Sequence, residues 1–132
     1  MVRLNKNSLN DKQFEKLVQQ LNVTLSKSNE AQVDQLVSGL LGYEERIMIA
    51  KRLGVILLLQ KGYNPYTVSQ ILNISPSTAG RIQTEMQSGN YDPALRVIKK
   101  DDKSYQAILR TIDSILTAGG IMPHYGQKPR NI

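Results

Sequence analysis

Residues 67–85, TVSQILNISPSTAGRIQTE, have the pattern of two short helices joined by a tight turn. Asn73 suits the turn, because asparagine adopts the left-handed backbone conformation more readily than most residues. Ile74 is expected to be buried directly after it. Ser75 and Pro76 suit the start of the second helix, since serine accepts a hydrogen bond from an unpaired backbone N–H and proline has no N–H to leave unpaired.

The second helix of this pair has two different faces. Its apolar positions recur at helical spacing and are expected to lie in the core: Ala79, Ile82 and Met86. The other face is small, polar and basic, and we predict that the residues contacting DNA are Ser75, Pro76, Ser77, Thr78, Gly80, Arg81 and Thr84. This arrangement predicts a helix-turn-helix, in which the second helix enters the major groove. An ordinary helical hairpin within a core is the alternative.

Composition favours a polyanionic partner. The chain has 132 residues, which suits one domain, a formal charge of +6 and a pI near 9.7. No Asp or Glu occurs between Arg46 and Thr84, which lowers the repulsion of phosphate groups over that segment. With no cysteine and one histidine, His124, we expect neither a disulfide nor a metal site.

Other classes of function receive little support. We expect no enzymatic activity, because the sequence has no nucleophile–base pair, metal-ligand set or glycine-rich phosphate loop. Glu44 and Glu45 are neighbours at a helix start, where they complement the helix dipole and do not converge as an acid/base pair. No long apolar run or signal-peptide pattern occurs, so we expect a cytoplasmic, nucleoid-associated protein without a membrane partner. A protein-interaction adaptor that docks through its apolar central helix is a further alternative.

The rest of the chain also has helical patterns, so we expect an all-α fold. Apolar residues at three- and four-residue spacing predict five further helices: one that follows a cap at Ser8 or Asn10 and ends near Leu25, and others over about 30–41, 43–61, 92–100 and 103–117. We divide the chain into N-terminal helices with a long central helix (1–62), the helix-turn-helix (63–90), C-terminal helices (91–118) and a flexible basic tail (119–132).

The central helix is apolar on every side from Leu53 to Leu59. Such a helix needs apolar partners all around it. Two amphipathic helices and a small helical pair hardly supply them, so we expect a second copy of the chain to cover the remainder. A homodimer also matches half-sites one turn of DNA apart. Burial of this helix within one larger monomer is the alternative.

Two segments carry a resemblance to a known family. Residues 40–62, LLGYEERIMIAKRLGVILLLQKG, open with Leu-Leu-x-x-x-Glu-Arg, and the second helix contains STAGRI and is followed by Gly89-Asn90-Tyr91. Together they resemble the tryptophan-operon repressor family, most closely its uncharacterised repressor-like branch. The resemblance implies an intertwined, all-helical homodimer that binds double-stranded operator DNA and represses transcription. In tryptophan-responsive members two arginines sandwich the indole of the corepressor, and by position these would be Arg52 and Arg81.

The chain departs from the tryptophan-responsive members beside the second arginine. Ile82 stands where those repressors have glycine, and the connector near Tyr63 is one residue longer. We therefore expect Arg81 to contact DNA and expect no cofactor, L-tryptophan included. An architectural DNA-binding protein of low specificity is the alternative function, because Ser77, Gly80 and Thr84 offer few bulky side chains for base recognition.

Overall fold

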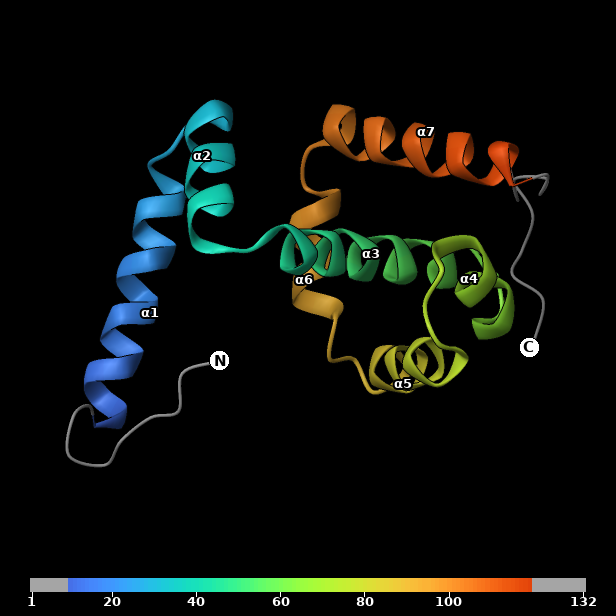
Figure 1. Ribbon diagram of the computed structural model, residues 1–132, viewed down its shortest axis with the longest axis horizontal. Helices are drawn as coiled ribbons and strands as arrows, with labels where there is room; N and C mark the ends of the chain where they lie inside the picture. Colours follow the sequence, from blue (N-terminus) through green and yellow to red (C-terminus); the bar gives the residue numbers. More distant parts are fainter. Residues whose placement is uncertain (1–9, 120–132) are drawn as a thin grey trace. The chain divides into compact units, whose positions relative to one another are not determined.

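The all-α expectation is confirmed. The computed structural model describes residues 10–119, and these form helices without any strand. In chain order the helices are α1 (Asp11–Ser26), α2 (Glu30–Leu40), α3 (Tyr43–Gln60), α4 (Pro65–Leu72), α5 (Pro76–Gln87), α6 (Asp92–Lys99) and α7 (Asp102–Ala118) (Figure 1). Within residues 10–119, none of these helices combines the length and the apolar character needed to cross a membrane.

Reciprocal capping sets the starts of the first two helices. The side chains of Asn10 and Asn29 each accept a hydrogen bond at 2.9 Å from the backbone N–H three residues later, that of Gln13 and of Gln32. The same glutamines accept from the N–H groups of the two asparagines, at 3.2 and 3.0 Å. Each pair satisfies two backbone donors that a helix start otherwise leaves unpaired.

The chain divides into two compact units, and the boundary follows Arg46, within α3. Residues 63–90 and 91–118 lie in the second unit together with most of α3. Of the predicted tail, residues 119–132, only Gly119 lies within the described residues.

The second unit has one hydrophobic core, built from α3, α4, α5 and α7 together with the connector after α3. Its buried members are Val55, Ile56, Leu57, Leu58, Tyr63, Val68, Ala79, Ile82, Ile112 and Leu116. Figure 1 shows α3 lying between α7 and α5. The predicted inward positions Ala79 and Ile82 are thus confirmed, and Met86 packs against the core partly buried.

A single chain buries the stretch of α3 from Gly54 to Leu58. Leu57 and Leu58 are 1% and 0% exposed, and their neighbours in the core come from α4, α5 and α7 of the same chain. Val55 to Leu58 therefore need no second copy of the chain to cover them, whereas Leu53 and Leu59 are only partly buried, and the homodimer itself stays a prediction. Besides the helical pair, α7 contributes Ile112 and Leu116 to the core around α3, and these partners were not expected from the sequence.

The first unit, in contrast, leaves apolar surface open. Neither α1 nor α2 contains a buried residue. Large apolar side chains exposed on them are Phe14, Leu17, Val18, Leu21, Val23 and Leu40. Several of these line a groove of about 470 Å³ between the two helices, formed by Leu17, Val18, Gln20, Leu21, Thr24, Leu36 and Leu40.

Candidate nucleic-acid interface

The turn between α4 and α5 has the predicted geometry. Asn73 ends α4 in the left-handed conformation, with φ 53° and ψ 56°. The N–H groups of Asn73 and Ile74 both donate to the carbonyl of Ser69, which closes the helix end. Ile74 then packs, partly buried, against the core. The change of direction between the two helices is therefore specified by one residue and the two hydrogen bonds beside it.

Ser75 begins α5 and is engaged within the protein. Its Oγ accepts a hydrogen bond from the Thr78 N–H at 3.1 Å and lies 2.7 Å from the Thr78 hydroxyl and 3.2 Å from that of Ser77. Pro76 occupies the first helical position and is exposed. Of the predicted DNA contacts at this helix start, Ser75 thus has a capping role, while Ser77 lies exposed beside it.

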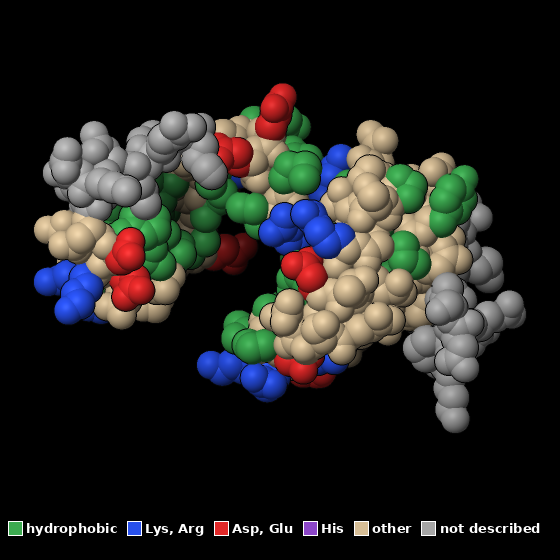
Figure 2. Space-filling model, turned by 90° about the horizontal axis from the view of Figure 1, so that it is seen from below, with side chains coloured by type: hydrophobic (Ala, Val, Ile, Leu, Met, Phe, Trp, Pro, Cys, Tyr) green, Lys and Arg blue, Asp and Glu red, His purple; other side chains and the backbone are tan. Residues whose placement is uncertain are grey.

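The far side of α5 from the core is polar and open. Ser77, Arg81 and Thr84 are exposed, and a Cβ added at Gly80 would meet no atom within 4 Å. The Thr84 hydroxyl donates to the Gly80 carbonyl at 3.1 Å, so an acceptor lone pair of its oxygen remains available. Figure 2 shows the surface over α5 to be made mainly of backbone and uncharged polar side chains.

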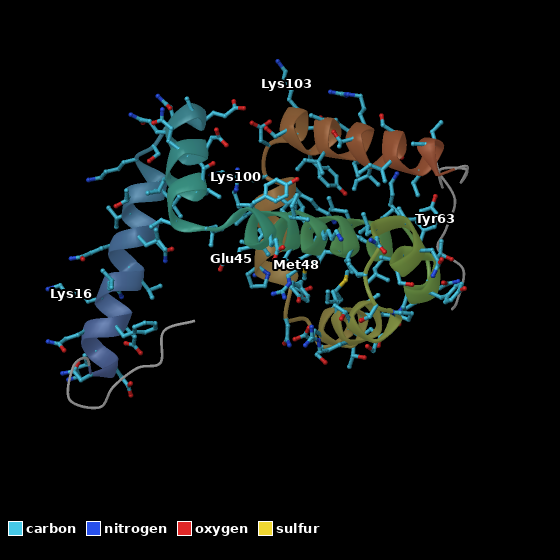
Figure 3. The ribbon with its side chains drawn as sticks, in the orientation of Figure 1. Lys16, Glu45, Met48, Tyr63, Lys100 and Lys103 are labelled. Carbon is cyan, nitrogen blue, oxygen red and sulfur yellow. The ribbon has the colours of Figure 1, made fainter. Side chains whose placement is uncertain are left out.

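Thr78 lies on a different side of α5 from these residues. It is partly buried and lines a small gap between α3 and α5, whose other lining residues are Met48, Lys51, Arg52, Val55, Ile74 and Ile82. Met48, labelled in Figure 3, comes from the first half of α3. The volume of the gap is about 10 Å³, which is the space of one water molecule. Ile82, at 2% exposed, fills the space beside α3.

Arg52 and Arg81, which the resemblance implies as corepressor contacts, occupy different surroundings. Arg52 is exposed at the edge of the gap, and Arg81 is exposed on α5. The gap between α3 and α5 is too small for an indole ring, which has many times the volume of a water molecule. Both guanidinium groups are available to solvent or to another molecule.

Two residues near this surface were not identified from the sequence as part of it. The Lys51 ammonium donates to the Asn73 carbonyl at 3.1 Å, across 22 positions of the chain. Gly54 faces α4, where an added Cβ would lie 3.1 Å from the Leu72 Cδ1 atom. A glycine inside an apolar helix is a signal for such a close approach. No local pattern points to the Lys51 contact.

The basic residues of the carboxylate-free segment have different partners. Lys61 forms an ion pair with Asp113 of α7 at 3.0 Å, with both side chains largely buried, so its charge is neutralised within the protein. The Arg46 guanidinium donates to Ser38 at 3.0 Å. Lys51, Arg52 and Arg81 are the basic residues of this segment that lie beside α5 or on it. Residues 10–119 contain no cluster of His, Cys, Asp or Glu that would hold a metal ion.

Comparisons with protein families, with characterised proteins and with solved structures give no match for this chain.

Proposed function

We propose that the chain is a sequence-specific DNA-binding transcriptional regulator, acting as a homodimer through a helix-turn-helix formed by α4 and α5. The open polar face of α5 carries this proposal, because the helix is anchored on its opposite side by Ala79 and Ile82, at 0% and 2% exposure. A helix held in this way presents its outer residues at a fixed orientation. Repression, as opposed to activation, is supported by the resemblance of residues 40–89 to the tryptophan-operon repressors.

The exposed groups of α5 suit the major groove. Arg81 has the planar guanidinium that bonds guanine O6 and N7 together, the commonest specific contact to a base. Gly80 lets the helix backbone approach the bases closely, and the Ser77 and Thr84 oxygens reach only groups near the helix. The start of α5 is also the positive end of the helix dipole, which favours a phosphate. No carboxylate between Arg46 and Thr84 opposes this approach.

The homodimer is supported by the open groove between α1 and α2. A continuous patch of large apolar side chains is unusual on a surface that faces water, and here it includes Phe14, Leu17, Val18, Leu21 and Leu40. A second copy of the chain provides the matching apolar side chains, including those left exposed at the start of α3, Ile47, Met48 and Ile49. The groove, open in a single chain, would then be covered in the dimer interface, and the two α5 helices would contact successive half-sites.

Variants on α1 test the dimer better than variants on α3. Leu57→Asp would bury a charge in the core of each chain and unfold it, whatever the oligomeric state. Leu21 is 39% exposed in one chain, so Leu21→Asp leaves a monomer folded but places a charge in a dimer contact. We expect light scattering to give a dimer mass for the wild type and a monomer mass for Leu21→Asp with its helical circular dichroism retained. A wild-type monomer at micromolar concentration would contradict the dimer.

In vitro selection of bound duplexes from a random library tests the DNA-binding proposal. Recovery of a two-fold symmetric motif is the expected result. Failure to retain any duplex at low salt would contradict DNA binding and favour an adaptor. One observation favours a second candidate, an architectural protein: on the side of α5 formed by Ser77, Gly80, Arg81 and Thr84, Arg81 is the single long side chain. Retention of duplexes without a shared motif would support that candidate.

A further inference from the structure

The turn before α5 is held from α3 by a polar contact. Within the turn, the Ser69 carbonyl is occupied by the N–H groups of Asn73 and Ile74. The Asn73 carbonyl lies beyond this closed helix end and accepts a hydrogen bond from the Lys51 ammonium at 3.1 Å. A contact between a charged donor and a carbonyl is stronger than one between neutral groups. It joins the turn to a helix that belongs to the buried core.

Lys51 shares one side of α3 with other residues that lie against the helical pair. Positions three and four residues apart share a face of a helix, and Gly54 and Val55 occupy those positions relative to Lys51. Gly54 lies against Leu72 at the end of α4, and Val55 lines the gap with Ile82 of α5. The end of α4, the turn and α5 are thus each contacted from one side of α3.

We infer that Lys51 is a positioning residue, which fixes the turn and thereby the orientation of α5 before DNA binds. The consequence for DNA rests on the proposed function, whereas the contact itself belongs to the free protein. The turn is the hinge between α4 and α5, so a restraint there limits rotation of α5 more directly than packing at its far end. With the gap closed to about 10 Å³ by Ile82, the chain supplies this restraint with its own side chain.

The ammonium group has further donors besides the one used by Asn73. Lys51 therefore has two separable effects on DNA binding: it orders the turn, and its charge attracts phosphate. Lys51→Met keeps the length of the apolar stem and removes both the donor and the charge. Lys51→Arg keeps both. Lys103→Met is the matched control, because Lys103 lies at the start of α7 with its side chain directed away from α3 (Figure 3).

Amide hydrogen exchange of the free protein tests the positioning role. The Ile74 N–H, which donates to Ser69 at 3.1 Å, reports opening of the turn. We expect its exchange to be about tenfold faster in Lys51→Met, near the wild-type rate in Lys51→Arg and unchanged in Lys103→Met. A wild-type rate in Lys51→Met, or equal acceleration in Lys51→Arg, would overturn the inference.

Binding of a selected duplex and of a scrambled duplex of the same length provides the second measurement. We expect Lys51→Met to lose more affinity for the selected duplex than for the scrambled one, and Lys51→Arg to restore the difference. Equal losses on both duplexes, with a salt slope reduced by about one and unchanged Ile74 exchange, would make Lys51 a phosphate contact only and overturn the inference. A wild type that binds neither duplex would contradict the proposed function, while the exchange measurement still decides the role of Lys51.

Discussion

Gly54 of α3 and Leu72 of α4 lie so close together that a Cβ on Gly54 would be 3.1 Å from the leucine Cδ1. Gly80 of α5 has no such neighbour, since an added Cβ there meets nothing within 4 Å. Glycine destabilises a helix interior by about 1 kcal/mol relative to alanine. The close packing of α3 against α4 explains why glycine occupies position 54. No contact within the chain requires glycine at position 80. Glycine there agrees with the proposal that another molecule approaches α5 closely.

Gly54→Val is expected to destabilise the protein by about 1–3 kcal/mol, because a branched side chain forces α3 and α4 apart in a packed region. Urea unfolding followed by circular dichroism measures the change. Gly80→Val is the matched control, since the same side chain there enters open space. Equal stability of the two variants would show that the contact between Gly54 and Leu72 does not restrict this position.

Gly80→Ala is expected to raise stability and to weaken DNA binding. The methyl group gains about 0.5–1 kcal/mol from helix propensity and meets no atom of the chain. In the proposed complex the same methyl group holds the helix backbone away from the bases. Thermal unfolding and a gel-shift titration measure the two effects. Undiminished affinity in the more stable variant would show that α5 does not approach DNA through Gly80.

Local features of the helical pair were predictable because their partners are close in the chain. Asn73 at the turn and the Ser75 cap depend on hydrogen bonds to residues three or four positions away, and such short-range preferences can be recognised in a sequence. The same holds for Asn10 and Asn29 at the starts of α1 and α2. These residues determine where helices begin and end, and so the all-α fold was predictable.

Contacts between distant parts of the chain were not predictable. Helical spacing shows that one face of α7 is apolar but not that Ile112 and Leu116 cover α3. Lys61 and Asp113, which form an ion pair, are 52 positions apart in the chain. The sequence around either residue does not indicate which residue it contacts. The sequence likewise predicts Thr78 as one of the residues that contact DNA, because spacing does not show that its side chain lies toward α3. A shared helix face can be inferred from spacing, whereas its neighbour depends on how the helices pack.

Substitutions of Ser75 separate its capping role from its contact with phosphate. Ser75→Ala removes the acceptor for the Thr78 N–H and is expected to destabilise the protein by about 1 kcal/mol. Ser75→Asp keeps an acceptor and suits the helix start, so stability is retained. The added carboxylate is expected to weaken DNA binding most at low salt, where charges are least screened. If Ser75→Asp binds duplexes as well as the wild type, phosphate does not lie near the start of α5.

Arg81→Ala is expected to weaken DNA binding by about 1–3 kcal/mol and to relax the sequence preference, since a contact to a base edge is lost. Arg81 is exposed, so stability should change little. Titration of the selected duplex and of a single-base variant measures both effects. Arg81→Lys is the informative control, because lysine keeps the charge without the bidentate geometry. Binding that is unaffected without tryptophan but lost with it would make Arg81 a corepressor contact.

The last prediction is that DNA binding does not require L-tryptophan. In tryptophan-responsive members of the tryptophan-operon repressor family, the indole lies between two arginines. By the resemblance, the corresponding residues here are Arg52 and Arg81. Between α3 and α5 the free volume is about 10 Å³, and the branched side chain of Ile82, 2% exposed, occupies the space that glycine would leave. A ligand with no room to bind cannot favour one orientation of α5 over another.

Duplex titrations with and without millimolar tryptophan, together with calorimetry of the free protein, test this prediction. A ligand shifts the DNA-binding equilibrium only by the difference in its affinity for the two states of the protein. We expect superimposable titrations and no calorimetric signal, because contact with Ile82 prevents the ring from entering. Lys51 instead restrains the turn in the free protein through the Asn73 carbonyl. An affinity gain of about tenfold, equivalent to about 1.4 kcal/mol of coupling, with one tryptophan bound per chain would show that the gap opens and that Ile82 moves aside.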